Sequence, residues 1–164
     1  MRIGLISDTH SYMKEEILKH LEECDEIWHA GDIGDMSVVD KLPKDKPFRA
    51  VYGNIDHGEV RNVYPLDLEF QINNVKFFIT HIGGYSGRYT KRVGGILRNN
   101  KPDVYICGHS HICKVIYDKK LSCLHINPGA CGVHGFHQIR TMVRFTVGQD
   151  KLEDVEVIEL GVRG

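Results

Sequence analysis

The sequence predicts an α/β fold in which two mixed β-sheets pack face to face and helices cover the outside. The first third of the chain alternates short apolar runs with amphipathic segments, which is typical of a parallel sheet with covered faces. The remainder holds a hairpin signal and further short apolar runs, which favour a second, more antiparallel sheet. The chain has 164 residues, 41% of them hydrophobic, so one domain spanning residues 1–164 can bury a substantial core.

The first third predicts a βαβαβ arrangement. Arg2–Ser7 is an apolar run suited to a buried strand, and Met13–Glu23 follows with apolar residues at helical spacing. We expect a second strand at Glu26–Ala30, a short helix at Val38–Leu42 and a third strand at Phe48–Tyr52.

The rest of the chain predicts mostly strands. Leu66–Ile72 and Lys76–Thr80 flank Asn73-Asn74, a pair that tolerates positive φ, which indicates a hairpin. Tyr89–Asn99 predicts a helix, although two glycines weaken its middle. Further strands are expected at Val104–Cys107, Val115–Tyr117, Ser122–Ile126, Met142–Val147 and Val155–Leu160.

Charge and composition argue against several classes of partner. With 21 basic and 22 acidic side chains the net charge is −1, so we expect no extended nucleic acid as a partner. No apolar run reaches the length of a transmembrane helix, so we expect no membrane partner. The first ten residues are too polar for a signal sequence, and the five cysteines include no CxxC pair. Free thiols and a cytoplasmic location are therefore expected.

Side chains that can bind metal follow five of the expected strands. Ligand sites in α/β sheets lie beyond the carboxyl ends of strands, where loops converge, so we expect these side chains to form one site. The glycines before Asp32, Asn54 and His109 are expected to let the backbone turn sharply and approach a ligand closely. The candidate ligands are Asp8, His10, Asp32, Asn54, His81, His109 and His111.

The donor types predict a pair of divalent cations. Carboxylates and imidazoles without a thiolate suit Mn²⁺, Fe²⁺, Ni²⁺ or Zn²⁺. Seven ligands exceed what one ion uses, so we expect two ions bridged by the carboxylate of Asp32. Two cations about 3.5–4 Å apart can clamp a phosphoryl group and lower the pKa of a bridging water.

Taken singly, most of these motifs have simpler explanations. Asp8 could cap the following turn, and Gly31-Asp32 and Asn54 are common in turns. His81 alone would more often be a partly buried histidine bonded to backbone. Gly108-His109-Ser110-His111 is stronger, because two imidazoles one residue apart beside a glycine are uncommon without a metal. The inference depends on all five positions following strand ends.

In order along the chain, these motifs resemble the signature of calcineurin-like metallophosphoesterases: Asp8-x-His10, Gly31-Asp32, Gly53-Asn54-x-Asp56, His81 and Gly108-His109-x-His111. Asn127-Pro128-Gly129 and the compact chain resemble the small prokaryotic phosphodiesterase branch. The resemblance implies a four-layer α/β sandwich, in which two mixed β-sheets are flanked by helices. It also implies two metal ions, for which Mn²⁺ is the favoured candidate. The first ion would be held by Asp8, His10 and His111, the second by Asn54, His81 and His109, with Asp32 between them.

The resemblance also implies an activity. A metal-bridging hydroxide would hydrolyse small or activated phosphodiesters, and Asn54 could also bond a phosphate oxygen. Small relatives are often dimers or tetramers, so a homodimer or homotetramer is expected. Larger relatives place a histidine after the asparagine to assist the leaving group, whereas this chain has Ile55, so a preference for aryl esters is expected.

Four further residues are candidates for roles around the metals. His57 could replace the missing histidine, although an exposed loop histidine is the alternative. Asp56 is expected to orient a ligand imidazole. His134 and His137 could line the mouth of the site and contact phosphate, or be ordinary surface histidines.

Two non-catalytic functions are alternatives to the enzyme. A subunit of the eukaryotic retromer coat resembles this fold and is a non-catalytic protein-binding scaffold with an eroded metal site. Here every expected ligand position holds a competent side chain, which favours the enzyme. A purely structural metal site needs closed coordination, and a weak neutral ligand such as Asn54 argues against it.

Overall fold

A computed structural model describes residues 1–164 and contains two five-stranded sheets. In the first sheet the strands β1, β2 and β3 run parallel, and β11 pairs antiparallel with both β1 and β12. Its strands, in spatial order, are β12 (Leu152–Val162), β11 (Ile139–Val147), β1 (Arg2–Ile6), β2 (Glu26–His29) and β3 (Phe48–Ala50).

The second sheet is also mixed. The hairpin β4–β5 is antiparallel, β8 lies parallel to both β5 and β10, and β9 is an antiparallel edge strand. Its strands, in spatial order, are β4 (Asp67–Ile72), β5 (Val75–Thr80), β8 (Val104–Ile106), β10 (Cys123–Pro128) and β9 (Cys113–Asp118). Both sheets are therefore mixed, as the sequence predicted.

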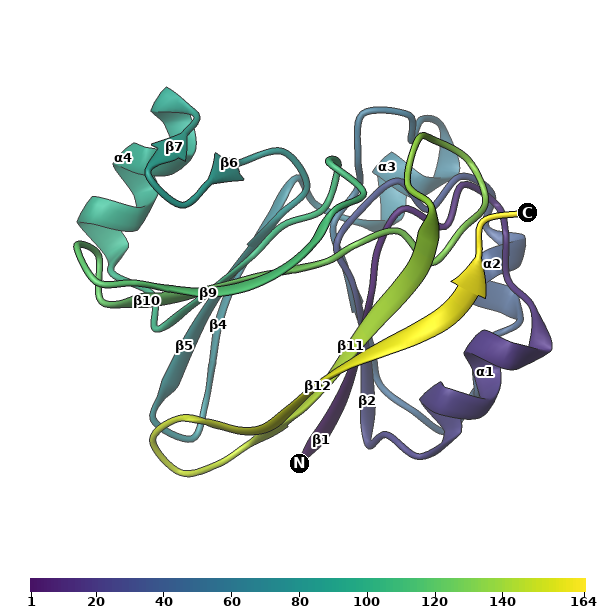
Figure 1. Ribbon diagram of the computed structural model, residues 1–164, viewed down its shortest axis with the longest axis horizontal. Helices are drawn as coiled ribbons and strands as arrows, with labels where there is room; N and C mark the ends of the chain where they lie inside the picture. Colours follow the sequence, from purple (N-terminus) through teal and green to yellow (C-terminus); the bar gives the residue numbers. More distant parts are fainter.

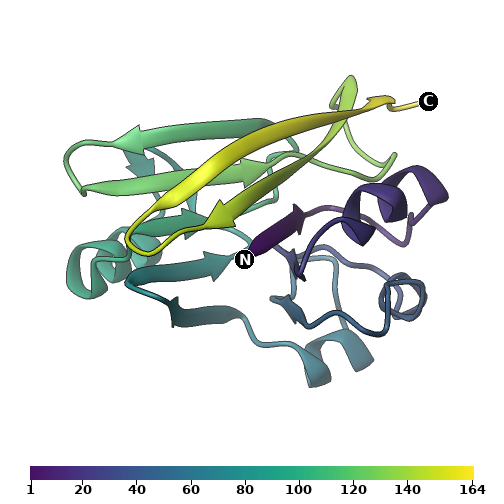
Figure 2. The ribbon, with the colours of Figure 1, turned by 90° about the horizontal axis from the view of Figure 1, so that it is seen from below.

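Helices cover the outer faces of the two sheets (Figure 1). In Figure 2, α1 (purple) and α4 (teal) lie at opposite ends with the sheets between them, so the chain forms the four-layer α/β sandwich that the resemblance implied. The helices are α1 (Glu15–Glu22), α2 (Ser37–Asp40), α3 (Glu59–Val63) and α4 (Lys91–Asn100). None of them is long and apolar enough to cross a membrane.

The layers follow from the alternation of side chains along each strand. In β1, Ile3 and Leu5 point into the core between the sheets, whereas Ile6 belongs to the core under α1 and α2. In β5, Phe77 joins the core between the sheets while Phe78 packs under α4. Burying each such side chain contributes about 1.5–3 kcal/mol, so both faces of each sheet stabilise the stack.

Four local elements differ from the sequence-based expectation. The fourth helix begins at Lys91 because Thr90 caps it, its Oγ1 accepting the Val93 N–H at 3.3 Å. Tyr89, expected in that helix, instead lies in β7 (Arg88–Tyr89), which pairs with β6 (Gly84–Tyr85). These two-residue strands and the five-residue α3 were not expected, because they are too short to show a periodic pattern.

Candidate metal centre

The loops after β1, β2, β5 and β8 bring six of the seven candidate ligands into two groups. Their possible ligand atoms lie within 4.8 Å of one another in each group. The first group is Asp8, His10 and His111, and the second is Asp32, His81 and His109. Asn54, which follows β3, joins the second group, its Oδ1 lying 3.1 Å from His81 Nε2. The division matches the two sets expected from the sequence, with Asp32 found in the second.

Asp32 faces both groups with different carboxylate oxygens. Its Oδ1 lies 3.2 Å from His81 Nε2, and its Oδ2 lies 3.5 Å from His10 Nε2. Burial would raise the pKa of Asp32, but the hydrogen bond and charge of His81 outweigh it and the pKa is lowered. An ionised carboxylate with one oxygen toward each group has the geometry that a bridging ligand requires.

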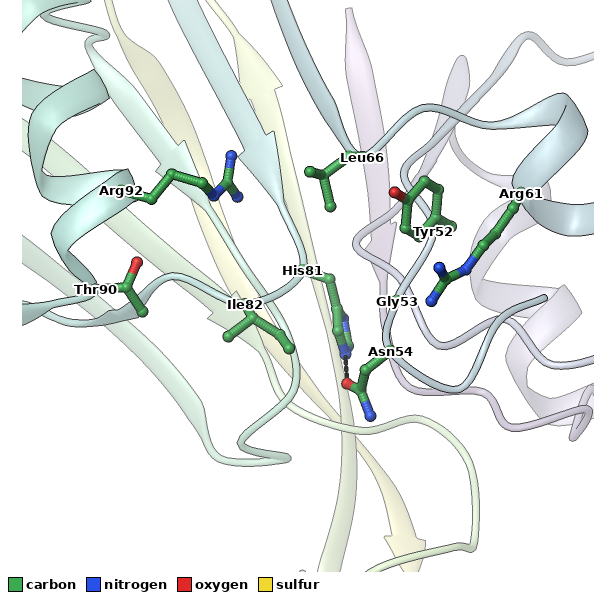
Figure 3. A pocket seen from close by; sticks show the side chains of 9 residues that line it. All are labelled: Tyr52, Gly53, Asn54, Arg61, Leu66, His81, Ile82, Thr90 and Arg92. Carbon is green, nitrogen blue, oxygen red and sulfur yellow. Dashed lines mark hydrogen bonds between the residues drawn. The ribbon is translucent and has the colours of Figure 1, made fainter.

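Backbone contacts fix which nitrogen of His81 faces the site. Its Nδ1 lies 2.8 Å from the carbonyl oxygen of Ala30 and so carries a proton. Its Nε2 then points at two oxygens, Asp32 Oδ1 and Asn54 Oδ1, and Figure 3 shows the second of these contacts. Burial lowers the pKa of His81, but the carboxylates of Asp32 and Asp8 outweigh that effect and raise it. The centre therefore attracts a positive charge at Nε2.

A chain of two histidines sets the tautomer of His111. His137 Nε2 lies 2.9 Å from the carbonyl oxygen of Gly132, and its Nδ1 lies 3.2 Å from His111 Nδ1. Burial lowers the pKa of His137, so the neutral ring donates from Nε2 and accepts at Nδ1. His111 must then donate from Nδ1, which leaves its Nε2, 3.2 Å from Asp8 Oδ1, as the nitrogen able to coordinate a cation.

Two buried atoms of the first group have no hydrogen-bond partner in the protein. Asp8 Oδ1 and His10 Nε2 are buried and make no hydrogen bond. Burial also lowers the pKa of His10, which keeps its imidazole neutral and able to coordinate. Buried polar atoms without partners are rare, because each costs about 1–3 kcal/mol. A cation between these atoms would remove that cost, so the residues present fit a divalent metal ion.

The candidate ligands sit on unusual backbone. Five non-glycine residues of the centre have φ between 44° and 68°, the left-handed region that few such residues adopt. Each costs of order 1–3 kcal/mol and persists only where the surroundings impose it, which is typical of functional sites. They are Asp8, His10, Asp32, His109 and His111.

Glycines allow the ligand loops to pack against each other. A Cβ on Gly53 would lie 2.0 Å from Asp32 Oδ1, and one on Gly108 would lie 2.8 Å from Asp8 Oδ2. Gly31 has φ +98°, and a Cβ there would lie 2.5 Å from the ring of His81. These three glycines therefore let neighbouring ligand loops pack closely, while their approach to a bound ligand stays a prediction.

Asp56 has a different role from the one expected. Its carboxylate accepts the backbone N–H groups of Ile33 at 3.1 Å, Gly34 at 2.7 Å and Gly53 at 2.7 Å. No imidazole donates to it, so the expectation that it orients a ligand imidazole was wrong. It ties the loop that carries Asp32 to the loop that carries Asn54, because each loop presents unpaired N–H groups to a shared buried anion.

Two other supporting contacts surround the loops. Asn127, part of the motif quoted above, donates from Nδ2 to the Gly108 carbonyl at 2.9 Å and to Ser110 Oγ at 3.1 Å. His29, which sequence reasoning missed, lies 2.9 Å from Thr9 Oγ1 and accepts the Gly31 N–H at its Nδ1. Burial lowers the pKa of His29 to about 4, so it is a neutral support for two ligand loops.

The remaining candidates lie at different distances from the centre. His134 lies beside His10, with ring centroids 4.7 Å apart and the ring planes tilted by 36°, and its contact with phosphate stays a prediction. Both ring nitrogens of His137 are already bonded, so the expected phosphate contact is corrected to support of His111. His57 is exposed and bonds the Ile55 carbonyl at 3.0 Å, and it lines neither cavity beside the centre.

Two cavities flank the centre and share Asn54. The histidine pocket, about 400 Å³, is lined by the site imidazoles and by three exposed apolar residues, Ile55, Ile112 and Phe136. The arginine pocket, about 420 Å³, is lined by Tyr52, Arg61, Leu66, Ile82 and Arg92, and it reaches His81 (Figure 3). Sequence reasoning missed this second pocket, because its arginines belong to no motif.

Known proteins resemble this chain over most of its length. Phosphodiesterase MJ0936 of Methanocaldococcus jannaschii is 27% identical over 148 residues, which cover 80% of this chain and 84% of the relative. A probable metallophosphoesterase of Methanothermobacter thermautotrophicus is 28% identical over 169 residues, covering 98% and 94%.

Solved structures share the fold. Wild-type Vps29 of Entamoeba histolytica, in complex with zinc, has a TM-score of 0.74 and 16% identity, and the likeness covers 98% of this chain and 100% of that one. At this identity the likeness concerns the fold alone. A model of the calcineurin-like phosphoesterase superfamily domain matches residues 1–150. The chain therefore belongs to the calcineurin-like phosphoesterase superfamily.

Proposed function

We propose that the protein is a phosphodiesterase that hydrolyses small or activated phosphodiesters and depends on two divalent metal ions. Mn²⁺ is the metal ion that we favour. One observation carries the proposal. Asp8 Oδ1 lies 3.2 Å from His111 Nε2 and, like His10 Nε2, is buried without a hydrogen-bond partner, an arrangement that a shared cation would stabilise. The phosphodiesterase relative from Methanocaldococcus supports the reaction class.

The two proposed ions divide among the residues as the geometry suggests. Asp8, His10 and His111 would hold one, and Asn54, His81 and His109 the other; Asp32 would bridge them. When bound, such a pair clamps a phosphoryl group and lowers the pKa of a water between the ions.

The protein's own groups would balance the positive charge of the two ions and position the phosphoryl group. The carboxylates of Asp8 and Asp32 supply the anionic ligands. The amide of Asn54 turns its Oδ1 toward His81, which leaves its Nδ2 to donate to a phosphate oxygen. Ile55 lines the histidine pocket and cannot supply a proton to a leaving alkoxide. A phenolate leaves without that proton more easily than an alkoxide, so aryl esters are the preferred substrates in this proposal.

A non-catalytic scaffold is the second candidate, and the likeness to Vps29 favours it. The complete ligand set and the strained backbone at five of the ligands argue for the enzyme, because a scaffold gains nothing from such strain.

A cytoplasmic location is also part of the proposal, because five free cysteines fit a reducing compartment.

An activity assay separates these functions. Protein stripped of metal with a chelator and reloaded with Mn²⁺, Fe²⁺, Ni²⁺ or Zn²⁺ should hydrolyse bis(4-nitrophenyl) phosphate faster than 4-nitrophenyl phosphate, and the stripped protein should not. Equal activity with and without metal would reject the metal-dependent mechanism. No hydrolysis of either ester with any of the four metals would favour the scaffold.

A further inference from the structure

The arginine pocket is positively charged. Two guanidinium groups line it and no aspartate or glutamate does. Figure 3 shows Arg61 and Arg92 on opposite sides of the pocket, with Asn54 and His81 between them. Arg61 comes from α3 beside the first sheet and Arg92 from α4 beside the second, so the pocket lies between the two halves of the chain.

The two arginines differ in how their charge is compensated. Arg92 binds both carboxylate oxygens of Asp67 and donates to Thr80 Oγ1 at 3.0 Å. Arg61 has no acidic partner: its Nε donates to the Asp56 carbonyl, and its guanidinium carbon lies 4.6 Å from the centre of the Tyr52 ring. These contacts hold the group in place and leave its two terminal nitrogens free to donate to a bound anion.

The pocket's position relates it to the proposed reaction. Asn54 lines both the arginine pocket and the histidine pocket, so a phosphoryl group at the centre would have one cavity on each side. A phosphodiester has two ester arms, one for each cavity. The cavities differ chemically, because one carries guanidiniums and the other carries imidazoles and exposed apolar side chains.

We infer that the arginine pocket is a specificity subsite that binds an ester arm carrying a second phosphate group, with Arg61 as its main ligand. Leu66, Ile82 and Tyr52 give the pocket apolar walls for the body of that arm. The volume of about 420 Å³ is within the range of small-molecule sites. The inference rests on the proposed phosphodiesterase function and adds its substrate class: unsymmetrical diesters with one doubly charged arm.

Two substrates that differ by one phosphate test this subsite. Thymidine 5′-(4-nitrophenyl phosphate) and its 3′-phosphorylated form release the same 4-nitrophenolate, so their kcat/KM values can be compared directly with the Mn²⁺-loaded enzyme at fixed ionic strength. The phosphorylated form should be preferred about tenfold, because a charge-assisted, bidentate contact to Arg61 adds binding energy.

Three variants assign the preference to its residue. Arg61→Gln should lower the ratio of the two kcat/KM values about tenfold, and Arg61→Lys should lower it less, because a lysine keeps the charge without the planar fork. Arg98→Gln is the matched control: it removes a charge from an exposed residue of α4 that lies outside the pocket, and it should keep the ratio. Since the result is a ratio within each protein sample, partial loss of folded protein does not change it.

The outcomes separate this inference from the proposed function. Equal kcat/KM values for the two substrates in the native enzyme, or a ratio that Arg61→Gln leaves unchanged, would overturn the inference. Hydrolysis of bis(4-nitrophenyl) phosphate but of neither thymidine ester would overturn it as well and leave the phosphodiesterase function standing. Failure with all three diesters would overturn both.

Discussion

His111 and His137 face each other through their Nδ1 atoms at 3.2 Å, which means that one of the two nitrogens carries the shared proton. The Gly132 carbonyl, 2.9 Å from His137 Nε2, assigns that proton to His111. The Nε2 of His111, 3.2 Å from Asp8 Oδ1, is thereby left as the nitrogen that can coordinate a cation. A residue outside the proposed ligand set thus prepares a ligand for a cation.

Replacing His137 should weaken metal binding. His137→Phe keeps a ring of similar size but cannot accept the Nδ1–H of His111, so we expect Mn²⁺ affinity to fall about 10- to 100-fold by calorimetric titration. His137→Gln offers an amide oxygen and should retain more affinity. His20→Phe, on α1 and away from the centre, is the control. Equal affinities for all four proteins would remove His137 from this role.

Asp56 should stabilise the fold before any metal binds. Asp56→Asn replaces one of its two acceptor oxygens with an amide group that faces a backbone N–H. We expect the free energy of unfolding of metal-free protein, measured in urea, to fall by on the order of 1–3 kcal/mol. An unchanged value would mean that the two ligand loops do not depend on this carboxylate.

A histidine at position 55 should supply the missing proton donor. Ile55 lines the histidine pocket beside Asn54, so Ile55→His would place an imidazole in the cavity expected to take a leaving group. General acid catalysis contributes about 10²–10⁴-fold where it operates fully, so we expect kcat for diphenyl phosphate to rise at least tenfold. The gain for bis(4-nitrophenyl) phosphate should be smaller, since nitrophenolate is the better leaving group.

The matched control for this prediction is Ile112→His, which places an imidazole elsewhere on the same cavity wall. It should change the two rates little and equally. If Ile55→His raised the rates for both esters by the same factor, or raised neither rate, proton donation to the leaving group would not limit the reaction.

The buried His125 should make stability depend on pH. Burial lowers its pKa to about 4, whereas in the unfolded chain the imidazole titrates near 6.5. Between these values the unfolded chain binds the extra proton, so stability should fall as the pH drops from about 6.5 to about 4. The shift corresponds to on the order of 3 kcal/mol, because the side chain is 1% exposed.

His125→Phe isolates this effect. A phenyl ring keeps the stacking on Tyr105, whose ring centroid lies 4.8 Å away, and removes the unpartnered Nδ1. Urea unfolding of metal-free protein at pH 7 and pH 4.5 should show a smaller loss of stability in the variant than in the native protein. The same loss in both would contradict the assignment.

Much of the fold could be predicted from the sequence. Apolar runs predict buried strands such as β1 and β5. The side chains that follow these strands were expected to lie close together, because parallel strands end at the same edge of a sheet. Asp32 and His109 were found in this way. Their left-handed backbone was not foreseen, since aspartate and histidine give no local signal for it.

The remaining features depend on contacts between distant segments. Asp56 was expected near the centre, but its partners are backbone N–H groups whose position only the folded loops define. His137 was noticed as a nearby histidine, yet its pairing with His111 joins residues 26 apart. Arg61 and Arg92 lie in separate helices that carry no recognisable motif, and they line one pocket only because the two sheets pack together.

The number of metal ions bound per chain tests the central claim most directly. Metal-free protein dialysed against Mn²⁺ and analysed for bound metal should hold two ions per chain and hydrolyse bis(4-nitrophenyl) phosphate. Asp32→Ala, which removes the carboxylate facing both ligand groups, should hold fewer than two and lose the activity. Saturation of the native protein at one ion or none, or activity that survives both chelation and Asp32→Ala, would contradict the account.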